Sequence, residues 1–404
     1  MTLAPWQRNQ YVRVATVFVV FTGFAFVLPF LTLYVRELGV TNEETAAAWA
    51  GLLIGIAPLL AGLLAPLWGR WADRRGQKRM VLRALASYVV LLTLSAFVTN
   101  VWQLLALRAG VGLFGGIGPL GLAMATSLAP REQTGRAVGM IQAAQILAAA
   151  VGPFAGGYLA DAIGIRLTFV VTATLCAAAL VLVLAYYREA PSRAPGQEGV
   201  AKAPFGEILR LPQVLPLLVV LFLVNFIGRS FTPILPLHLK ELGVAPARLA
   251  FSTGALISAY SVAAAISASV FGRASRTRSP RALLALSLVG GAATVLPMAF
   301  VKTFGAMTGL AVLVGLASGG CLTLCYTIGG LMVPSDRRTT AFGFFSAAAL
   351  FGGALSPSVA GLLARWQLRG IYYADAAIFA LLLAGLVFAT RPVPAPQPSP
   401  DEAV

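Results

Sequence analysis

The chain has 404 residues, of which 58% are hydrophobic and only 11% are charged, and its mean hydropathy is +0.84. This composition excludes a water-soluble globular protein, because there is too little polar side chain to cover its surface. The formal net charge of +16 could suit a nucleic acid, so the positions of the basic residues must decide what they meet.

Twelve apolar stretches follow one another along the chain, each close to the roughly 20 residues that a helix needs to cross about 30 Å of hydrocarbon. They are continuous rather than alternating, which predicts helices and not barrel strands. All three cysteines lie inside them, so no disulfide is expected. We predict an all-α integral membrane protein with spans at 11–36, 46–68, 80–99, 101–128, 136–160, 165–187, 213–238, 247–272, 282–301, 304–332, 340–364 and 371–390.

The basic residues are distributed unevenly between the two sides of the predicted bundle. With the N-terminus placed in the cytoplasm, cytoplasmic segments hold 21 of the 30 Lys and Arg residues, and external loops hold seven. This bias follows the positive-inside rule and predicts that both termini are cytoplasmic. The basic loops then face anionic headgroups, so membrane lipids and not nucleic acid are the expected partner.

The second half of the sequence repeats the first at an offset of 204 residues. The register holds without insertion from Pro29, which falls on Pro233, to Gly157, which falls on Gly361. Six helices per copy return the chain to the membrane in the same orientation, which predicts a parallel duplication with substrate sites between the halves. The expected division is an N-terminal six-helix bundle at 1–187, a cytoplasmic linker at 188–211, a C-terminal six-helix bundle at 212–391 and a disordered cytoplasmic tail at 392–404.

A short basic segment after the second span carries one acid between two glycines. It reads GRWADRRGQKR and contains Gly69, Asp73, Arg74 and Gly76. We expect Gly69 to let two helices approach closely and Gly76 to permit a turn with positive φ. A solvated basic loop would account for the arginines but not for the acid.

This segment resembles the signature loop of the major facilitator superfamily, a family of membrane transporters, and departs from its pattern only at Gln77. The resemblance implies the major facilitator fold, with twelve transmembrane helices in two six-helix bundles. It also implies that Asp73 latches the cytoplasmic side. The implied partners of Asp73 are Arg136 or Arg131 and the start of the eleventh helix near Thr339 and Thr340.

The fifth predicted span carries a glycine–proline segment with Gly152, Pro153, Gly156 and Gly157. It is similar to the signature of the exporters and drug antiporters of the same superfamily. Small residues let helices pack closely, and proline removes one backbone hydrogen bond, so the segment is a candidate sliding contact between the halves. Ordinary small-residue packing is the alternative.

Two arginines lie well away from the ends of predicted spans, where a charge is costly and functional by default. Arg108 lies in a segment that resembles the family's intramembrane arginine motif, with Val111 where Gln is usual. The resemblance implies a coupling role, and snorkelling to the surface is the alternative. Arg229 shares a helix face with Asn225, and we expect it to contact an anionic or polar part of a substrate rather than a backbone carbonyl.

Five further residues are candidates for substrate contacts. Gln142 and Gln145 share one face of the fifth span, Tyr326 lies in the tenth, and Phe30 and Tyr34 lie in the first. An aromatic side chain in a span is more often core or lipid-facing, which is the alternative for these three aromatics.

These features predict a secondary active transporter, a monomeric multi-pass protein of the cell inner (cytoplasmic) membrane. Resemblance to the multidrug/proton antiporter branch implies export of small amphipathic compounds by alternating access, coupled to protons through Asp73 or Asp161. Because no acid lies mid-membrane, we expect neutral, zwitterionic or anionic substrates rather than cations. A lipid or sugar-conjugate flippase or exporter, or an importer, is the alternative.

An enzyme is disfavoured by the same sequence. There is one histidine, and no metal-ligand cluster or external acidic pair stands out. General acid–base chemistry therefore has few candidates, and we expect no catalytic residue, metal or cofactor.

Overall fold

The computed structural model describes residues 5–115, 134–188, 214–275, 277–333 and 338–389, and at a few helical positions it describes only the backbone. Within these ranges, eight helices are long and apolar enough to cross a membrane, or nine if one bent pair forms a single span. Two shorter apolar helices lie at Val101–Phe114 and Gly370–Leu386. An all-helical membrane protein is confirmed. The number twelve and the cytoplasmic termini stay predictions.

The chain forms two compact units, and the border between them does not follow the sequence repeat. Unit 1 is Met1–Glu198, Ser230–Ser258 and Ala354–Leu368, and unit 2 is Gly199–Arg229, Ala259–Gly353 and Arg369–Val404. Unit 1 therefore combines the first repeat with two segments of the second. The division into bundles at 1–187 and 212–391 stays a prediction.

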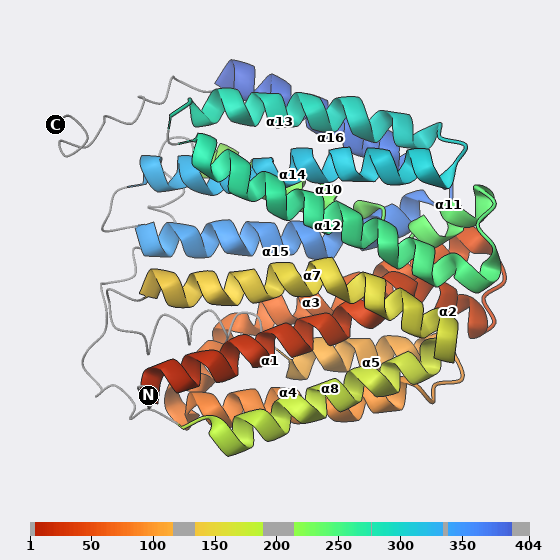
Figure 1. The fold of residues 1–404 in the computed structure, drawn as a ribbon, viewed down its shortest axis with the longest axis vertical. Coiled ribbons are helices and arrows are strands. Elements are labelled where there is room, and N and C mark those ends of the chain that lie inside the picture. The colour runs from red at the N-terminus through yellow and green to blue at the C-terminus, as the bar shows by residue number, and fades with distance from the viewer. Residues whose placement is uncertain (1–4, 116–133, 189–213, 276, 334–337, 390–404) are drawn as a thin grey trace. The chain divides into compact units, whose positions relative to one another are not determined.

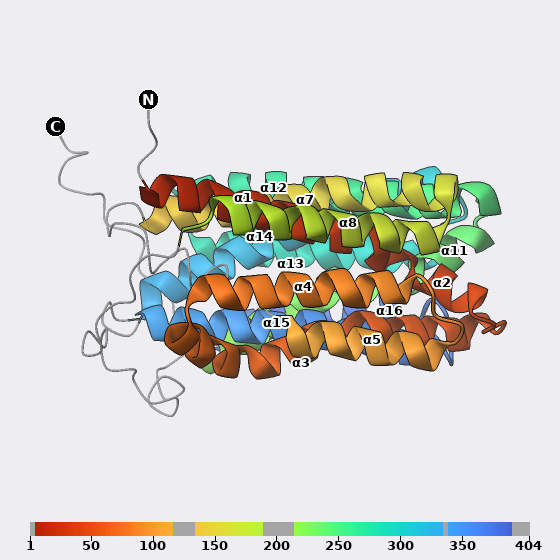
Figure 2. The same ribbon diagram turned by 90° about the horizontal axis from the view of Figure 1, so that it is seen from below.

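Unit 1 is built from the helices of the first repeat and a few short pieces of the second. Its elements are α1 (Pro5–Val27), η1 (Leu28–Phe30), α2 (Leu31–Glu37), α3 (Glu43–Arg75), α4 (Gln77–Ser95), α5 (Val101–Phe114), α7 (Thr134–Ile163), α8 (Ile165–Tyr186), α11 (Leu235–Glu241), η3 (Pro246–Arg248), the start of α12 (Leu249–Ala274) and the end of α15 (Arg338–Leu363). In it α1 packs on α7 and α8 (Figure 1), while α4 lies beside α8 and α3 beside α5 (Figure 2).

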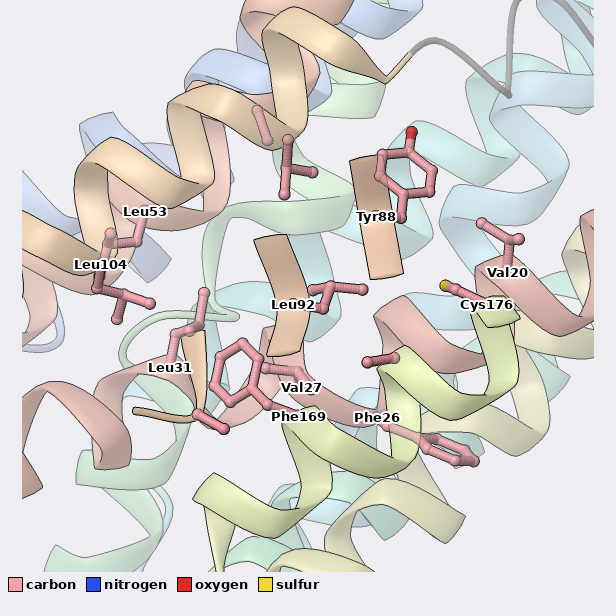
Figure 3. Packing of buried hydrophobic residues seen from close by; sticks show 14 of the residues in the cluster. Val20, Phe26, Val27, Leu31, Leu53, Tyr88, Leu92, Leu104, Phe169 and Cys176 are labelled. Carbon is pink, nitrogen blue, oxygen red and sulfur yellow. The ribbon is translucent and has the colours of Figure 1, made fainter. Parts of the chain in front are cut away.

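The core of unit 1 is a continuous apolar cluster between these helices. Phe169 of α8, Leu31 of α2 and Leu92 of α4 are buried close to Val27, where α1 ends (Figure 3). Each comes from a different helix, so the cluster joins them. Inside a bilayer such packing depends on complementary shape, because lipid tails are as apolar as leucine.

Unit 2 contains the remaining helices. They are α10 (Val214–Ser230, to Arg229), the rest of α12, α13 (Pro280–Val295), η4 (Leu296–Ala299), α14 (Phe304–Met332), the first part of α15 and α16 (Gly370–Ala389). Helix α13 packs on α14 and α16 (Figure 1). At one end of this packing the Arg281 guanidinium donates to Leu386 O at 2.8 Å.

Two spans change their helix geometry at the same place in the repeat, the first while remaining one continuous span and the seventh as a bent pair of helices. The first span changes to a 3-10 turn at Leu28–Phe30, which contains Pro29. The seventh stops at Ser230 and resumes at Leu235 with a bend of 44°, and Pro233 lies between. Proline has no N–H to donate and clashes with the preceding turn, which explains both changes.

The segment expected to form a loop after the second span is helical apart from one residue. Helix α3 continues to Arg75, Gly76 has φ +91°, and α4 begins at Gln77. The positive φ predicted for Gly76 is confirmed. The expectation of a polar loop around it is wrong. A single glycine makes the whole turn, and the charged residues extend the helices on either side.

Gly164 joins α7 to α8 with a backbone conformation that can be tested by substitution. Its φ is +84°, and nothing lies within 4 Å of the position that a Cβ would occupy. We expect Gly164→Ala to lower the melting temperature in detergent, because essentially only glycine adopts φ +84° with ψ +159° and an L-residue costs about 1–3 kcal/mol there. Gly62→Ala in α3 is the matched control, since it also meets open space but has a helical backbone. An equal effect of the two substitutions would contradict this account.

Candidate functional site

Helices α7 and α12, which belong to different repeats, meet inside unit 1 with their backbones in contact. At Gly254 an added Cβ would meet the Pro153 carbonyl, and at Gly157 it would lie 2.5 Å from Ala250 O. The N–H of Phe154 donates to Ser258 Oγ at 3.0 Å. The glycine–proline segment is therefore packed directly on the second repeat. We call this contact the α7–α12 seam.

A second seam joins α3 to the end of α15. An added Cβ at Gly51 would meet the Pro357 carbonyl, and one at Gly361 would meet the backbone of Ala47. Ser358 Oγ donates to Gly51 O at 3.2 Å. Pro357 and Gly361 are the repeat mates of Pro153 and Gly157. Each seam is therefore formed by a proline and a glycine at equivalent positions of the two repeats.

The other two glycines of the segment face the first repeat. A Cβ at Gly152 would meet Ala25, and one at Gly156 would meet the backbone of Phe26. Helix α7 therefore uses glycines on two sides, against α1 and against α12. The contacts with α1 are ordinary small-residue packing, and the contacts with α12 join the two repeats, so each interpretation of the segment describes part of this geometry.

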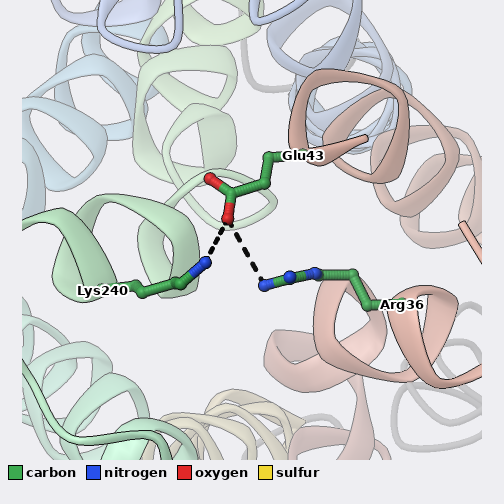
Figure 4. Close-up of polar contacts among 3 residues, drawn as sticks. All are labelled: Arg36, Glu43 and Lys240. Atoms are coloured by element: carbon green, nitrogen blue, oxygen red, sulfur yellow. Dashed lines mark hydrogen bonds and ion pairs between the residues drawn. The ribbon is translucent and has the colours of Figure 1, made fainter. Parts of the chain in front are cut away.

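Polar contacts reinforce the end of unit 1 that contains the turns 36–43, 161–165 and 241–249, which we call the clasp end. The Glu43 carboxylate lies between Lys240 Nζ at 2.5 Å and Arg36 Nη1 at 3.5 Å (Figure 4). Thr32 Oγ1 donates to Pro233 O at 2.6 Å, so the two spans touch close to their equivalent prolines. A buried carbonyl needs a hydrogen-bond donor, and the threonine hydroxyl supplies one.

Asp161 makes a further contact between the repeats at the clasp end. Its carboxylate, in the last turn of α7, accepts from Phe251 N at 2.8 Å and from Ala250 N at 3.3 Å. Asp161 had been expected only as a candidate for proton coupling. The structure places it against the first residues of α12.

Arg108 lies in α5 with only 2% of its surface exposed. Its Nε donates to Leu53 O of α3 at 3.0 Å. The side chain is thus directed into unit 1 and does not snorkel to the surface. A buried guanidinium tied to a neighbouring helix is consistent with a structural as well as a coupling role, and the coupling role stays a prediction.

Arg229 has a different environment in unit 2. The residue is exposed, although protein atoms surround it. Its Cδ and Nε lie 3.2 and 3.3 Å from the position that a Cβ at Gly353 would occupy, so this glycine of α15 makes room for the arginine. Among the described residues Arg229 forms no ion pair. The side-chain amide of Asn225 donates to Leu221 O of its own helix at 3.0 Å.

Tyr260 of α12 lies next to Arg229 and was not anticipated. Its hydroxyl is 2.8 Å from Ser318 Oγ of α14 and 3.2 Å from the position of a Cβ at Gly228. It lies within electrostatic range of Arg229 and also of the buried carboxyl group of Asp375 in α16. A guanidinium and a phenol in the same region can bind an anion or a polar group. The sequence offered one signal for this residue, because a polar side chain inside a predicted span is a candidate for a functional site.

The remaining candidates are divided between the units. In unit 1, Phe30 and Tyr34 are fully buried in the core, and the Tyr34 hydroxyl donates to Ser95 O at 2.8 Å. We therefore do not carry these two forward as substrate contacts. Gln142 is exposed and Gln145 half-buried on α7. In unit 2, Tyr326 of α14 is half-buried.

Several predicted gate residues lie outside the described side chains. For Gly69, Asp73, Arg74 and Arg136 the structure gives only a helical backbone, and Arg131 is outside the described ranges. The implied latch between Asp73 and Arg136 or the start of α15 stays a prediction.

The clasp-end contacts were largely missed by sequence reasoning. Gly51 and Gly55 form a small-xxx-small pattern that predicts close helix packing, and both face α15. By contrast, nothing in the sequence pairs Glu43 with Lys240, which are 197 residues apart.

Comparison with known proteins identifies the family. The family model described as Major Facilitator Superfamily matches residues 14–256 and 233–404. The chain belongs to this superfamily, which together with its apolar helices makes it a multi-pass membrane protein, of the inner membrane in a bacterium.

Relatives named as multidrug resistance proteins are similar over most of the chain. Multidrug resistance protein MdtG of Serratia proteamaculans (strain 568) is 34% identical over 327 residues, which cover 81% of this chain and 80% of that protein. The protein of the same name from Proteus mirabilis (strain HI4320) is 29% identical over 389 residues, covering 95% and 97%.

Two solved structures share the fold. A bacterial homologue of the human lysosomal transporter Spinster, in an inward-facing and occupied conformation, has a TM-score of 0.79 and 17% identity and covers 97% of this chain and 98% of its own. The human organic anion transporter MFSD10 (TETRAN) has a TM-score of 0.67 and 18% identity and covers 95% and 100%.

The α7–α12 seam can be tested by adding one methyl group. In Gly157→Ala the Cβ would lie 2.5 Å from Ala250 O and 2.9 Å from Phe251 Cα, so the two helices must separate. We expect a loss of about 1–3 kcal/mol, seen as a lower melting temperature. Gly309→Ala in α14 meets open space and is the matched control. A melting temperature for Gly157→Ala that equals that of the control would show that the helices do not touch here.

Proposed function

We propose that the protein is a secondary active transporter that exports small amphipathic compounds by alternating access, with twelve spans in two six-helix bundles. The observation that carries this proposal is Arg229. A cation inside a predicted span, exposed and without an acidic partner among the described residues, is a suitable contact for a substrate. The names of the multidrug resistance relatives support export of drug-like molecules.

The charge at this position favours neutral, zwitterionic or anionic substrates over organic cations. A guanidinium repels a cationic amphiphile and can form two hydrogen bonds to a carboxylate or phosphate. Tyr260 supplies a neutral hydroxyl beside it. That a protein of the same fold is an organic anion transporter agrees with this choice. Asn225 and Tyr326 complete the proposed contacts within unit 2, and Gln142 and Gln145 are the candidates from unit 1.

Proton coupling belongs to the same proposal. Asp73 and Asp161 are the candidate carboxylates, and Arg108 is a further candidate for coupling. The cytoplasmic termini follow from the positive-inside bias, which places the clasp end at the external face. With this orientation, contact between the repeats at the clasp end closes the external side, and transport requires it to open.

The substrate assignment is tested by a thermal-shift screen of the purified protein against anionic, zwitterionic, neutral and cationic amphiphiles. We expect anionic compounds to raise the melting temperature and Arg229→Ala to abolish the rise, because the contact is lost, while Arg229→Lys keeps part of it. Arg273→Ala, an exposed arginine at the end of α12, is the control. Shifts confined to organic cations, or unchanged in Arg229→Ala, would remove Arg229 from the site.

Coupling is tested in proteoliposomes loaded with a compound from that screen. An imposed pH gradient should accelerate export several-fold, and Asp161→Asn and Asp73→Asn should show which carboxylate is required. Glu44→Gln, an exposed acid at the start of α3, is the control. Equal rates with the gradient present and collapsed would exclude proton antiport.

A further inference from the structure

The clasp end contains one carboxylate whose partners are backbone atoms of a helix from the other repeat. Asp161 of α7 accepts from the amides of Ala250 and Phe251 at the start of α12. The first amides of a helix have no partner inside the helix, and the helix dipole favours a negative charge beside them. Asp161 therefore acts as the N-cap of α12, supplied from another helix.

Helix α12 has no capping side chain of its own. The turn before it begins at Ala245, which makes no side-chain hydrogen bond, and continues with Pro246 and Ala247. Helix α3 holds the equivalent place in the first repeat and is capped locally, because Asn42 accepts from Thr45 N at 2.7 Å. The cap on α12 thus depends on α7 staying in place.

Asp161 is reachable from water and forms no ion pair with any residue that the structure describes. The residue is exposed, and its described interactions are the two backbone amides. Nearby basic groups are engaged elsewhere, since Arg166 acts on Glu37 and the Lys240 and Arg36 side chains hold Glu43. The other charged or titratable groups on the elements at this end are His238 and Glu241 of α11 and Arg248 of η3, and none of them is a described partner of Asp161.

We propose that Asp161 is a proton-binding latch: while ionised it holds α12 against α7, and when it takes up a proton from the external side it releases them. Protonation converts one carboxylate oxygen into a hydroxyl, which is a weaker acceptor for an amide, and removes the charge that the helix start favours. The glycine–proline contacts of the seam carry no charge, so acid acts on this seam through Asp161. The proposal relies on the proposed function for the claims that this end faces the external side and that it opens during transport.

The latch is tested by measuring the separation of α7 and α12 as a function of pH. Spin labels at Ile163→Cys and Ala247→Cys, both exposed, report this separation by dipolar EPR in nanodiscs without substrate or gradient. The native cysteines are buried. We expect the short-distance population to fall about threefold or more between about pH 8 and about pH 4, the effect of losing one anion–helix contact.

Two variants in the labelled protein identify the acid responsible. Asp161→Asn should abolish the pH response, and Glu43→Gln, which removes the other carboxylate that links the repeats at this end, should leave it intact. No response in the labelled parent, a response that survives in Asp161→Asn, or one lost in Glu43→Gln would overturn the proposal. If Asp161→Asn fails to fold, the absence of a response in the parent or its loss in Glu43→Gln would still overturn the proposal. Because no transport is measured, an inactive exporter with an intact latch remains distinguishable from a failed latch.

Discussion

Backbone contact between helices of the two repeats is the interaction on which the arrangement of unit 1 depends. At Gly254 and Gly51 a side chain of any size would collide with the carbonyl of a proline on the facing helix. In a bilayer, burial of apolar surface does not choose one helix partner over another, so close packing and hydrogen bonds must. This packing explains why residues 230–258 and 354–368 join a compact unit with the first repeat.

The two seams are alike in packing but differ in charge. Pro153 and Gly157 are matched by Pro357 and Gly361, and a serine hydroxyl joins each pair of helices. The acids have no such match, since the repeat mate of Asp161 is Arg365 and that of Glu43 is Ala247. The first repeat therefore supplies both carboxylates that hold the second. A duplicated frame with unequal ionic contacts can respond to pH at one seam and not at the other.

Much of the architecture could be predicted from local sequence properties. Apolar length predicted the helices, and the glycine at position 76 predicted a positive φ, because only glycine adopts it without strain. The 3-10 turn at Pro29 and the break at Pro233 were not predicted, although both prolines were matched in the repeat, because proline is tolerated in many membrane helices. Phe30 and Tyr34 were placed near a substrate because spacing along one helix does not tell which neighbour covers it, and both lie in the core.

The sequence by itself determined the membrane character, the repeat, the family and the presence of costly charges within spans, because each depends on composition or on residues close together along the chain. Only the tertiary structure decided what those charges meet. It placed Arg108 against a carbonyl of α3, left Arg229 exposed beside Tyr260, and set Asp161 on the first amides of α12. The physical reason is that the partners of a buried or capping charge are contributed by helices distant in sequence, and their approach depends on packing that no single segment encodes.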